Sequence, residues 1–251
     1  MREKMKAAGI HLLMSVLIIS FVFCLIYFVW YPAPFYEESG GRRLIEIIFG
    51  VDLVLGPLLT LIVFNKNKSL KTNLWDVAVI ACFQMFALGY GVNSVFKARP
   101  VFVAFEYDRF TVVHANDIDP AQIFSGQTVF PGGLPVCGPE LLGVKRPVDE
   151  SDKLNSMMQS LGGTTAAAQP MLWDFYEKLS PEIIAKSKNV KFLMEKFPNR
   201  VTDISSILRK NNINEKNAIF IPMAIKNSFW TVIFDVSNLN RPYYINIDSF
   251  E

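Results

Sequence analysis

Residues 44–64 read LIEIIFGVDLVLGPLLTLIVF, an apolar stretch with an aspartate, Asp52, in its interior. Similar apolar stretches occupy residues 11–31 and 74–95. Each has about the 20 residues that a helix needs to cross a hydrocarbon core of about 30 Å. The sequence therefore predicts a membrane domain, residues 1–96, with three transmembrane helices. Because a carboxylate inside such a segment is costly and usually has a partner or a function, Asp52 is the first candidate site residue.

The remaining residues, 97–251, have the composition of a soluble domain. The whole chain is 51% hydrophobic and has a mean hydropathy of +0.27, but its apolar residues are concentrated before residue 97. From residue 97 onward, 17 Lys and Arg residues balance 17 Asp and Glu residues. This balance gives no preference for an anionic partner, so no nucleic acid is expected. The length is sufficient for a hydrophobic core.

The basic residues of the first half predict an orientation. They gather in residues 1–6 and in the link 65–73, which has three lysines and no acidic residue. The link 32–43, in contrast, carries both acidic and basic residues. Positive residues near membrane ends stay in the cytoplasm. We therefore expect a multi-pass inner-membrane protein with a cytoplasmic N-terminus and a periplasmic domain, residues 97–251. The first stretch is longer than the apolar core of a signal peptide and lacks an A-x-A site, so we interpret it as a retained anchor.

The periplasmic domain shows separate groups of strand and helix patterns. Residues 117–148 are rich in Gly and Pro and predict irregular structure. Alternation and flanking turn residues predict five strands, at 101–106, 110–114, 218–225, 229–236 and 243–247. Helical spacing predicts four helices, at 149–161, 166–179, 181–197 and 201–210. Because strands and helices are segregated along the chain, we expect an α+β domain with antiparallel strands.

The two aspartates of the membrane segments, Asp52 and Asp76, invite comparison with an intramembrane aspartyl protease. A helix rises 1.5 Å per residue, so Asp52 lies roughly 18 Å from the cytoplasmic end of its segment and Asp76 about 3 Å from the start of its own. Carboxyl groups at such different depths cannot share a proton as a catalytic dyad. We interpret Asp76 as an interfacial residue within reach of the lysine-bearing link 65–73.

The same depth count places Gln84 nearly level with Asp52. A glutamine amide donates a hydrogen bond to a carboxyl group in either protonation state. The pair either joins two helices of one bundle or offers part of its polarity to another membrane helix. A proton or ion path is a third alternative, although three helices rarely enclose one. Four glycines also permit close helix contact: Gly50, Gly56, Gly89 and Gly91.

The periplasmic domain shows no convincing catalytic pattern. His114 is its only histidine, so any multi-His zinc site or Ser–His arrangement depends on that one residue. The G-x-S-x-G, H-E-x-x-H and G-x-x-x-x-G-K-[ST] patterns are absent from the sequence. We therefore expect a binding protein rather than an enzyme, with no metal, no cofactor and no small-molecule substrate.

Residues 49–113 carry a series of motifs that resembles the TfpX/TfpZ family of type IV pilin accessory proteins. The motifs are G-V-D-x-x-x-G-P-x-x-T, a lysine-bearing loop, D-x-x-x-I-x-x-x-Q, A-L-x-Y-G and R-P-V-x-x-x-F-x-x-D-R-F. The sequence matches them at Gly50, Asp52, Gly56, Pro57, Thr60, Asp76, Ile80, Gln84, Tyr90, Gly91, Arg99, Pro100, Phe105, Asp108, Arg109 and Phe110. The resemblance covers about residues 45–115 and is weak beyond them.

The resemblance implies an inner-membrane, chaperone-like accessory protein that assists a cognate type IV major pilin before or during pilus assembly, without catalysis. The partners would be the transmembrane helix and the periplasmic head of the pilin, within the lipid bilayer. Candidate helix-contact residues are Asp52, Gln84, Gly56 and Pro57, and candidate interface or anchor residues are Asp76, Arg99, Asp108 and Arg109. Two alternatives stay open: a structural component of a pilus or secretion machine without pilin specificity, and a membrane-anchored periplasmic enzyme.

Overall fold

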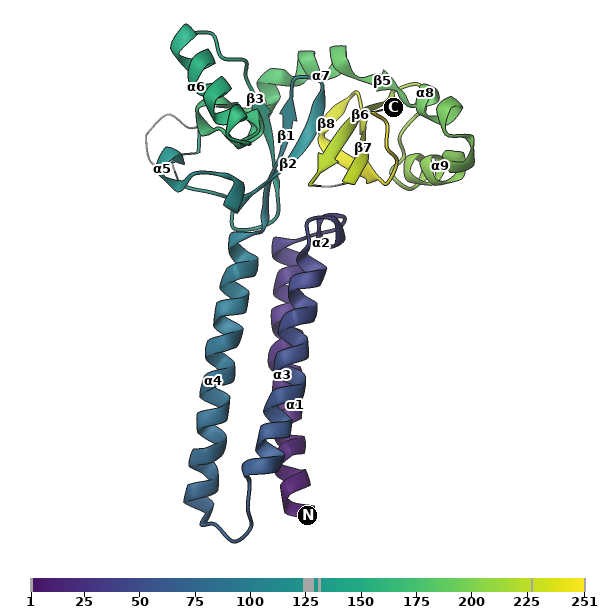
Figure 1. The fold of residues 1–251 in the computed structure, drawn as a ribbon. Coiled ribbons are helices and arrows are strands. Elements are labelled where there is room, and N and C mark those ends of the chain that lie inside the picture. The colour runs from purple at the N-terminus through teal and green to yellow at the C-terminus, as the bar shows by residue number, and fades with distance from the viewer. Residues whose placement is uncertain (1, 124–128, 131, 227, 251) are drawn as a thin grey trace. The chain divides into compact units, whose positions relative to one another are not determined.

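A computed structural model describes residues 2–123, 129–130, 132–226 and 228–250. The chain divides into two compact units, Met1–Arg99 and Pro100–Glu251, whose elements are labelled in Figure 1. Each unit has its own buried apolar side chains.

The regular secondary structure in the described part of the first unit is all helical. Its elements are α1 (Arg2–Leu25), the π-helix η1 (Ile26–Trp30), α2 (Phe35–Glu38), α3 (Gly41–Val63) and α4 (Leu70–Lys97). Three helical stretches are long and apolar enough to cross a membrane, by length and composition: Arg2–Trp30, Gly41–Val63 and Leu70–Lys97. They extend beyond the apolar runs because polar residues continue the helical turns at their ends. Many large apolar side chains of these helices face outward, as a lipid environment favours.

The three long helices share a cluster of buried apolar side chains around Trp30. The buried residues there include Ile26 of η1, Ile45 of α3 and Val95 of α4. The Tyr31 hydroxyl donates to the Val95 carbonyl oxygen over 3.0 Å, and the rings of Trp30 and Phe96 lie 5.0 Å apart. This end of the unit is therefore held by both apolar packing and a buried hydrogen bond.

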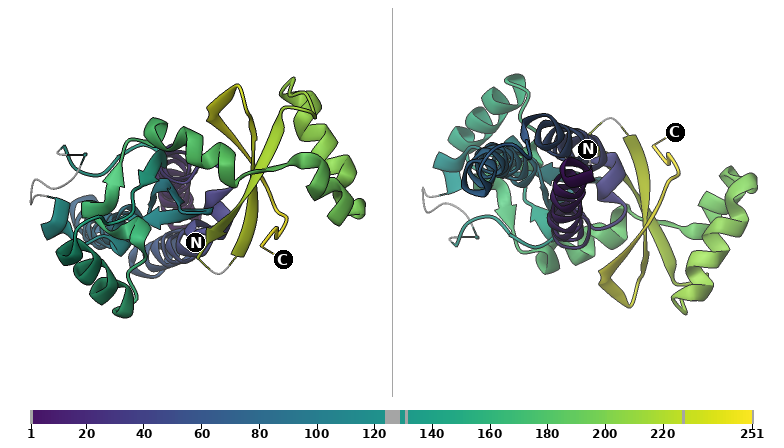
Figure 2. Two further views of the ribbon diagram at one scale, coloured as in Figure 1. Left: turned by 90° about the horizontal axis from the view of Figure 1, so that it is seen from above. Right: turned by 90° about the horizontal axis from the view of Figure 1, so that it is seen from below.

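The second unit is built on a curled sheet with short helices around it (Figures 1 and 2). Its strands are β1 (Pro100–Glu106), β2 (Arg109–His114), β3 (Glu140–Val144), β4 (Trp173–Asp174), β5 (Lys188–Asn189), β6 (Ala218–Ile225), β7 (Ser228–Asp235) and β8 (Asn238–Ile245). Its helices are η2 (Ala115–Asp117), α5 (Pro120–Ile123), α6 (Glu150–Leu161), η3 (Ala166–Ala168), η4 (Pro170–Leu172), η5 (Tyr176–Leu179), α7 (Ser180–Lys186), α8 (Val190–Lys196), η6 (Pro198–Arg200) and α9 (Val201–Lys210).

The sheet is mixed, so the expectation of antiparallel strands is confirmed for most strand pairs but not for all. Within the described residues the strand order is β4-β3-β1-β2-β6-β7-β8, with β5 also paired to β6. The pairs β1–β3 and β2–β6 are parallel, and the remaining pairs are antiparallel. Long connections precede β3 and β6 in the chain, so β3 can lie parallel to β1 and β6 parallel to β2. A short hairpin would instead make neighbouring strands antiparallel.

Three of the predicted segments have a different structure. The expected helices at 166–179 and 181–197 are broken into 3-10 turns, the short strands β4 and β5, and the seven-residue helices α7 and α8. Pro170 lies in this segment, and its missing N–H is incompatible with a helix interior. The region 117–148, expected to be irregular, contains β3, which pairs in parallel with β1 along five residue pairs.

The second unit has two apolar cores that meet at a narrow seam. One core lies around Phe102 and Trp173, and the other around Leu193 and Ile233. Strands β2 and β6 join them through only two register pairs, Phe110 with Met223 and Thr111 with Ala224. The Phe110 ring lies 5.5 Å from the ring of Phe105 in β1 and 5.5 Å from that of Phe234 in β7. The Phe110 ring therefore packs against one aromatic ring on each side of the seam.

Candidate functional site

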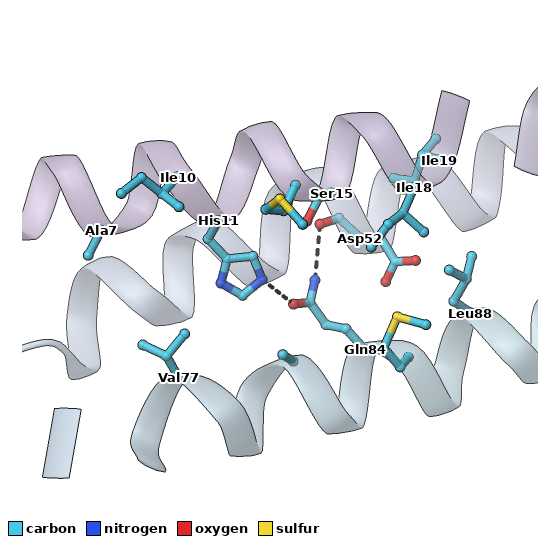
Figure 3. Close-up of a pocket in the computed structure, with 13 residues that line it drawn as sticks. Ala7, Ile10, His11, Ser15, Ile18, Ile19, Asp52, Val77, Gln84 and Leu88 are labelled. Atoms are coloured by element: carbon cyan, nitrogen blue, oxygen red, sulfur yellow. Dashed lines mark hydrogen bonds between the residues drawn. The ribbon is translucent and has the colours of Figure 1, made fainter. Parts of the chain in front are cut away.

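A series of side-chain hydrogen bonds links α1, α3 and α4 inside the first unit (Figure 3). His11 of α1 lies between Thr60 of α3, with Nδ1 to Oγ1 2.7 Å, and Gln84 of α4, with Nε2 to Oε1 2.6 Å. The Gln84 amide nitrogen donates to the backbone carbonyl oxygen of Asp52 over 3.1 Å. One histidine and one glutamine thus join the three long helices.

The partners of His11 determine where its proton lies. The Gln84 Oε1 atom is a carbonyl oxygen and only accepts, so Nε2 of His11 must donate to it. In a neutral imidazole the other nitrogen, Nδ1, then accepts from the Thr60 hydroxyl. Every bond in the series has one donor and one acceptor with this assignment. A satisfied network of this kind fixes the rotation of each helix as well as its depth.

The carboxyl group of Asp52 stands apart from this network. Asp52 is 5% exposed, and its Oδ1 atom has no hydrogen-bond partner among the residues that the structure describes. The predicted link between Asp52 and Gln84 therefore runs through the backbone of Asp52 rather than through its carboxyl group. A buried polar group without a hydrogen bond costs several kcal/mol in hydrocarbon, so a donor placed at this oxygen would be stabilising.

Asp52 also borders two cavities in the first unit. The larger, of about 330 Å³, is lined by residues of α1, α3 and α4, including His11 and Gln84 at its polar side (Figure 3). Its walls are otherwise almost entirely apolar, and Ile10 and Met14 on its rim are exposed. A second cavity of about 250 Å³ lies between α3 and α4 beside Gly91. Asp52 therefore lies beside unfilled space that the long helices leave along their contact.

Gly56 is required for the approach of Gln84 to α3. A Cβ atom at this position would overlap the side-chain amide of Gln84, whereas one at Gly50 would meet nothing within 4 Å. Gly91 allows a second close approach, because a Cβ there would lie 2.9 Å from Ile48. Gly89, like Gly50, faces open space. Pro57 lies inside α3 directly after Gly56, where it removes one backbone donor from the helix.

The predicted interface or anchor residues lie outside this group. Asp76 forms an ion pair with Lys68 of the preceding link, with Oδ2 and Nζ 2.6 Å apart. Arg99 is buried, donates to the Phe96 carbonyl oxygen over 2.8 Å and lies 3.8 Å from the centre of the Phe96 ring. Asp108 and Arg109 form an exposed ion pair in the turn between β1 and β2, 2.8 Å apart. None of these residues lines the two cavities at Asp52.

His11 and Thr60 are the two site residues that the sequence reasoning did not assign. His11 stood at the first position of the apolar run 11–31, where it reads as a boundary residue. The helix in fact begins at Arg2, so His11 lies more than two turns inside it. A histidine at this position, together with a Thr and a Gln within the predicted transmembrane segments, was the available signal.

His114, in the other unit, is a buried histidine. It is 1% exposed, its Nδ1 lies 3.2 Å from Asp117 Oδ2, and its Nε2 has no partner within the described part of the chain. Burial lowers the pKa of His114, and the hydrogen bond with Asp117 only partly opposes this effect. Among the residues that the structure describes, no three His, Cys, Asp or Glu side chains gather so as to hold a metal ion.

The lowered pKa of His114 predicts a pH-dependent stability. The unfolded chain takes up a proton on this histidine near pH 6.5, and the folded chain does so only at lower pH. The contribution of His114 to the folding stability is therefore fully present above about pH 6.5 and is lost as the pH falls below it. We expect the melting temperature to drop by a few degrees between pH 7.5 and 5.5, and to drop less in His114→Asn. Equal decreases in both proteins, measured by thermal unfolding in detergent, would contradict this assignment.

Three apolar helices able to cross a membrane, followed by an α+β unit, characterise a membrane-associated protein. Residues 1–40 match the family model described as fimbrial assembly protein FimB. The fimbrial assembly protein of serogroup I from Dichelobacter nodosus is 34% identical, over 98% of this chain and 96% of that protein. The serogroup E1 protein from the same organism is 32% identical over the same shares.

A third relative, the fimbrial assembly protein of serogroups C1 and C2 from Dichelobacter nodosus, is 40% identical over 45% of this chain and 86% of its own length. No solved structure matches the chain. The two full-length similarities show that the chain belongs to the family of fimbrial assembly proteins.

Proposed function

We propose that this protein acts in pilus assembly by binding a cognate type IV major pilin in the inner membrane and promoting its stability or incorporation into pili. The membership in the fimbrial assembly protein family supports the process. The narrower resemblance to the TfpX/TfpZ accessory proteins supports the choice of partner. In this proposal the N-terminus is cytoplasmic and the unit Pro100–Glu251 is periplasmic.

The single observation that carries the proposal is the buried, unpartnered carboxyl oxygen of Asp52 beside an apolar cavity. A transmembrane helix of a partner would find apolar walls from α1 and α4 and one acceptor at Asp52. Helices associate in membranes through packing and interhelical hydrogen bonds, because lipid offers no hydrophobic driving force between them. The site therefore suits an apolar helix with one polar group at the matching depth, as the pilin of the resembled family provides.

The series His11–Gln84 has a supporting role in this binding. It holds α1 and α4 at fixed distances from α3, so that the cavity keeps its walls when no partner is present. Its own donors and acceptors are used within the unit, which leaves the Asp52 carboxyl group as the group that is offered to the partner. No step of the proposed function requires catalysis.

The test is the recovery of pilin with Asp52→Ala and Gln84→Ala variants in detergent. A lost hydrogen bond in a membrane is worth about 0.6–2 kcal/mol, so Asp52→Ala should lower the co-purified pilin by about threefold to thirtyfold. Gln84→Ala should lower it as well, because the cavity walls lose their support. Asp76→Ala is the matched control, since this aspartate pairs with Lys68 away from the cavity, and it should leave the recovery unchanged. Unchanged recovery and normal surface piliation in both test variants would contradict direct helix contact.

A further inference from the structure

Helix α6 (Glu150–Leu161) carries an exposed apolar stripe on one of its faces. The stripe consists of Leu154, Met157, Met158 and Leu161, which follow the i, i+3, i+4, i+7 spacing of a single helix face. Each of the four side chains is 61–77% exposed. The helix lies at the end of the second unit that is remote from β7 and β8 (Figures 1 and 2). A surface helix normally turns such a stripe toward the core.

The opposite, inward face of α6 is polar. Ser156 is 7% exposed, while Asp152 and Gln159 are half-buried. This face is attached to the rest of the unit through Gln169, which is fully buried and donates from Nε2 to the Ser156 carbonyl oxygen and to the Ser160 hydroxyl, each over 3.3 Å. Buried amides are retained where their hydrogen bonds fix an orientation, and here the fixed orientation points the apolar stripe away from the core.

The exposed stripe has the properties of a docking surface. Contiguous exposed apolar patches on soluble units mark interaction sites more often than isolated apolar residues do. Two of the four side chains are methionines, whose flexibility suits adaptable binding surfaces. The i, i+3, i+4, i+7 spacing is the arrangement with which a helix lays its apolar face against a protein partner.

The charges at the ends of α6 restrict what covers the stripe. Its N-terminal end carries Asp149, Glu150 and Asp152, while Lys153 is paired to Glu150 over 2.8 Å. An acidic helix end without aromatic residues is disfavoured at an anionic bilayer, where surface-bound helices carry Lys and Arg. If α6 of a second copy of the chain covered the stripe, an antiparallel arrangement of the two helices would place the acidic end beside the uncharged residues 160–165. A parallel arrangement would place the two acidic ends beside each other. Neither arrangement gives the acidic end a complement.

We propose that the stripe on α6 docks an apolar surface of a partner protein that has Lys or Arg side chains at its edge, facing the acidic end of the helix. This inference rests on the proposed function, and it identifies the partner as the part of the pilin that lies outside the membrane. The contact is separate from the cavity at Asp52, so the pilin is held at two independent sites.

The test places a photo-crosslinking residue on the stripe in the full-length protein, co-produced with the pilin of the same organism. Met158→benzoylphenylalanine is expected to crosslink to pilin on illumination. Asn155→benzoylphenylalanine, on an exposed flank of the same helix, is the matched control and should crosslink far less. Crosslinks from position 158 only to a second copy or to lipid, or none at all, would overturn the proposal.

A second variant separates this inference from the proposed function. Met157→Gln combined with Met158→Gln should lower pilin recovery by about fivefold or more, as expected for the loss of central interface residues. Because both side chains are exposed, the melting temperature should stay that of the unmodified protein. If the unmodified protein recovers pilin and the double variant recovers as much, the stripe is not a pilin site. If the unmodified protein itself recovers none, the proposed function fails.

Discussion

Phe110→Ala is expected to destabilise the unit Pro100–Glu251 by about 3–5 kcal/mol, the range for removing a large buried aromatic side chain. Phe110 is fully buried at the seam between the two cores, with the rings of Phe105 and Phe234 on either side. Only two register pairs join β2 to β6 there, so few other contacts compensate for the loss. The melting temperature should fall by about 2–4 °C for each kcal/mol.

The effect should be largest at the seam itself. Hydrogen exchange is expected to rise in β6 next to Met223 before it rises in β1. Phe192→Ala is the control, because Phe192 on α8 is 50% exposed and its removal leaves no enclosed cavity. Phe110→Leu should lie between the two variants, since it keeps most of the apolar volume. A Phe110→Ala protein as stable as Phe192→Ala would contradict the role assigned to the seam.

Gly56→Ala is expected to destabilise the first unit by about 1–3 kcal/mol, through the loss of two hydrogen bonds between its apolar helices. The added Cβ occupies the space of the Gln84 amide. That amide is the end of a flexible side chain, so it moves away and gives up its bonds to His11 and to the Asp52 carbonyl oxygen. Gly50→Ala has the same change in helix propensity but meets no neighbour, and it should not destabilise the protein.

The double variant Gly56→Ala, Gln84→Ala gives the sharper measurement. If the glycine acts only by making room for the amide, removing the amide abolishes the penalty for the added methyl group. The double variant should then be no less stable than Gln84→Ala alone, as measured by thermal unfolding in detergent. Additive losses, or a Gly56→Ala protein as stable as Gly50→Ala, would show that the amide does not depend on Gly56.

Short-range patterns were sufficient for several elements of the second unit. The strands at 101–106 and 110–114 and the helix at 201–210 agree with β1, β2 and α9 to within one residue, because alternation and helical spacing are local properties. Strand β3 was missed because it lies in a Gly- and Pro-rich region and is stabilised by its distant partner β1. The same dependence on distant partners made the sheet mixed rather than antiparallel.

The sequence predicted at which level along their helices Asp52 and Gln84 lie, but not how each helix is rotated about its axis. Counting residues placed Gln84 level with Asp52, and the two do meet. The count carries no information about which atom of Asp52 faces Gln84, and the carbonyl oxygen rather than the carboxyl group does so. His11 was missed because the apolar run begins later than the helix, which starts at Arg2. Polar residues before an apolar run can therefore belong to the same helix.

The order in which the three long helices occur in the chain has a consequence for biogenesis. A carboxylate at the centre of an inserting helix costs about 2.5–3.5 kcal/mol, so α3 enters a membrane less readily than its other residues would allow. When α3 emerges from the ribosome, α1 has already been made and presents His11 to Thr60. Gln84 arrives only with α4. Newly made α3 thus first gains a partner near its C-terminal end, and the surroundings of Asp52 are completed only by α4, the last of the three long helices to be synthesised.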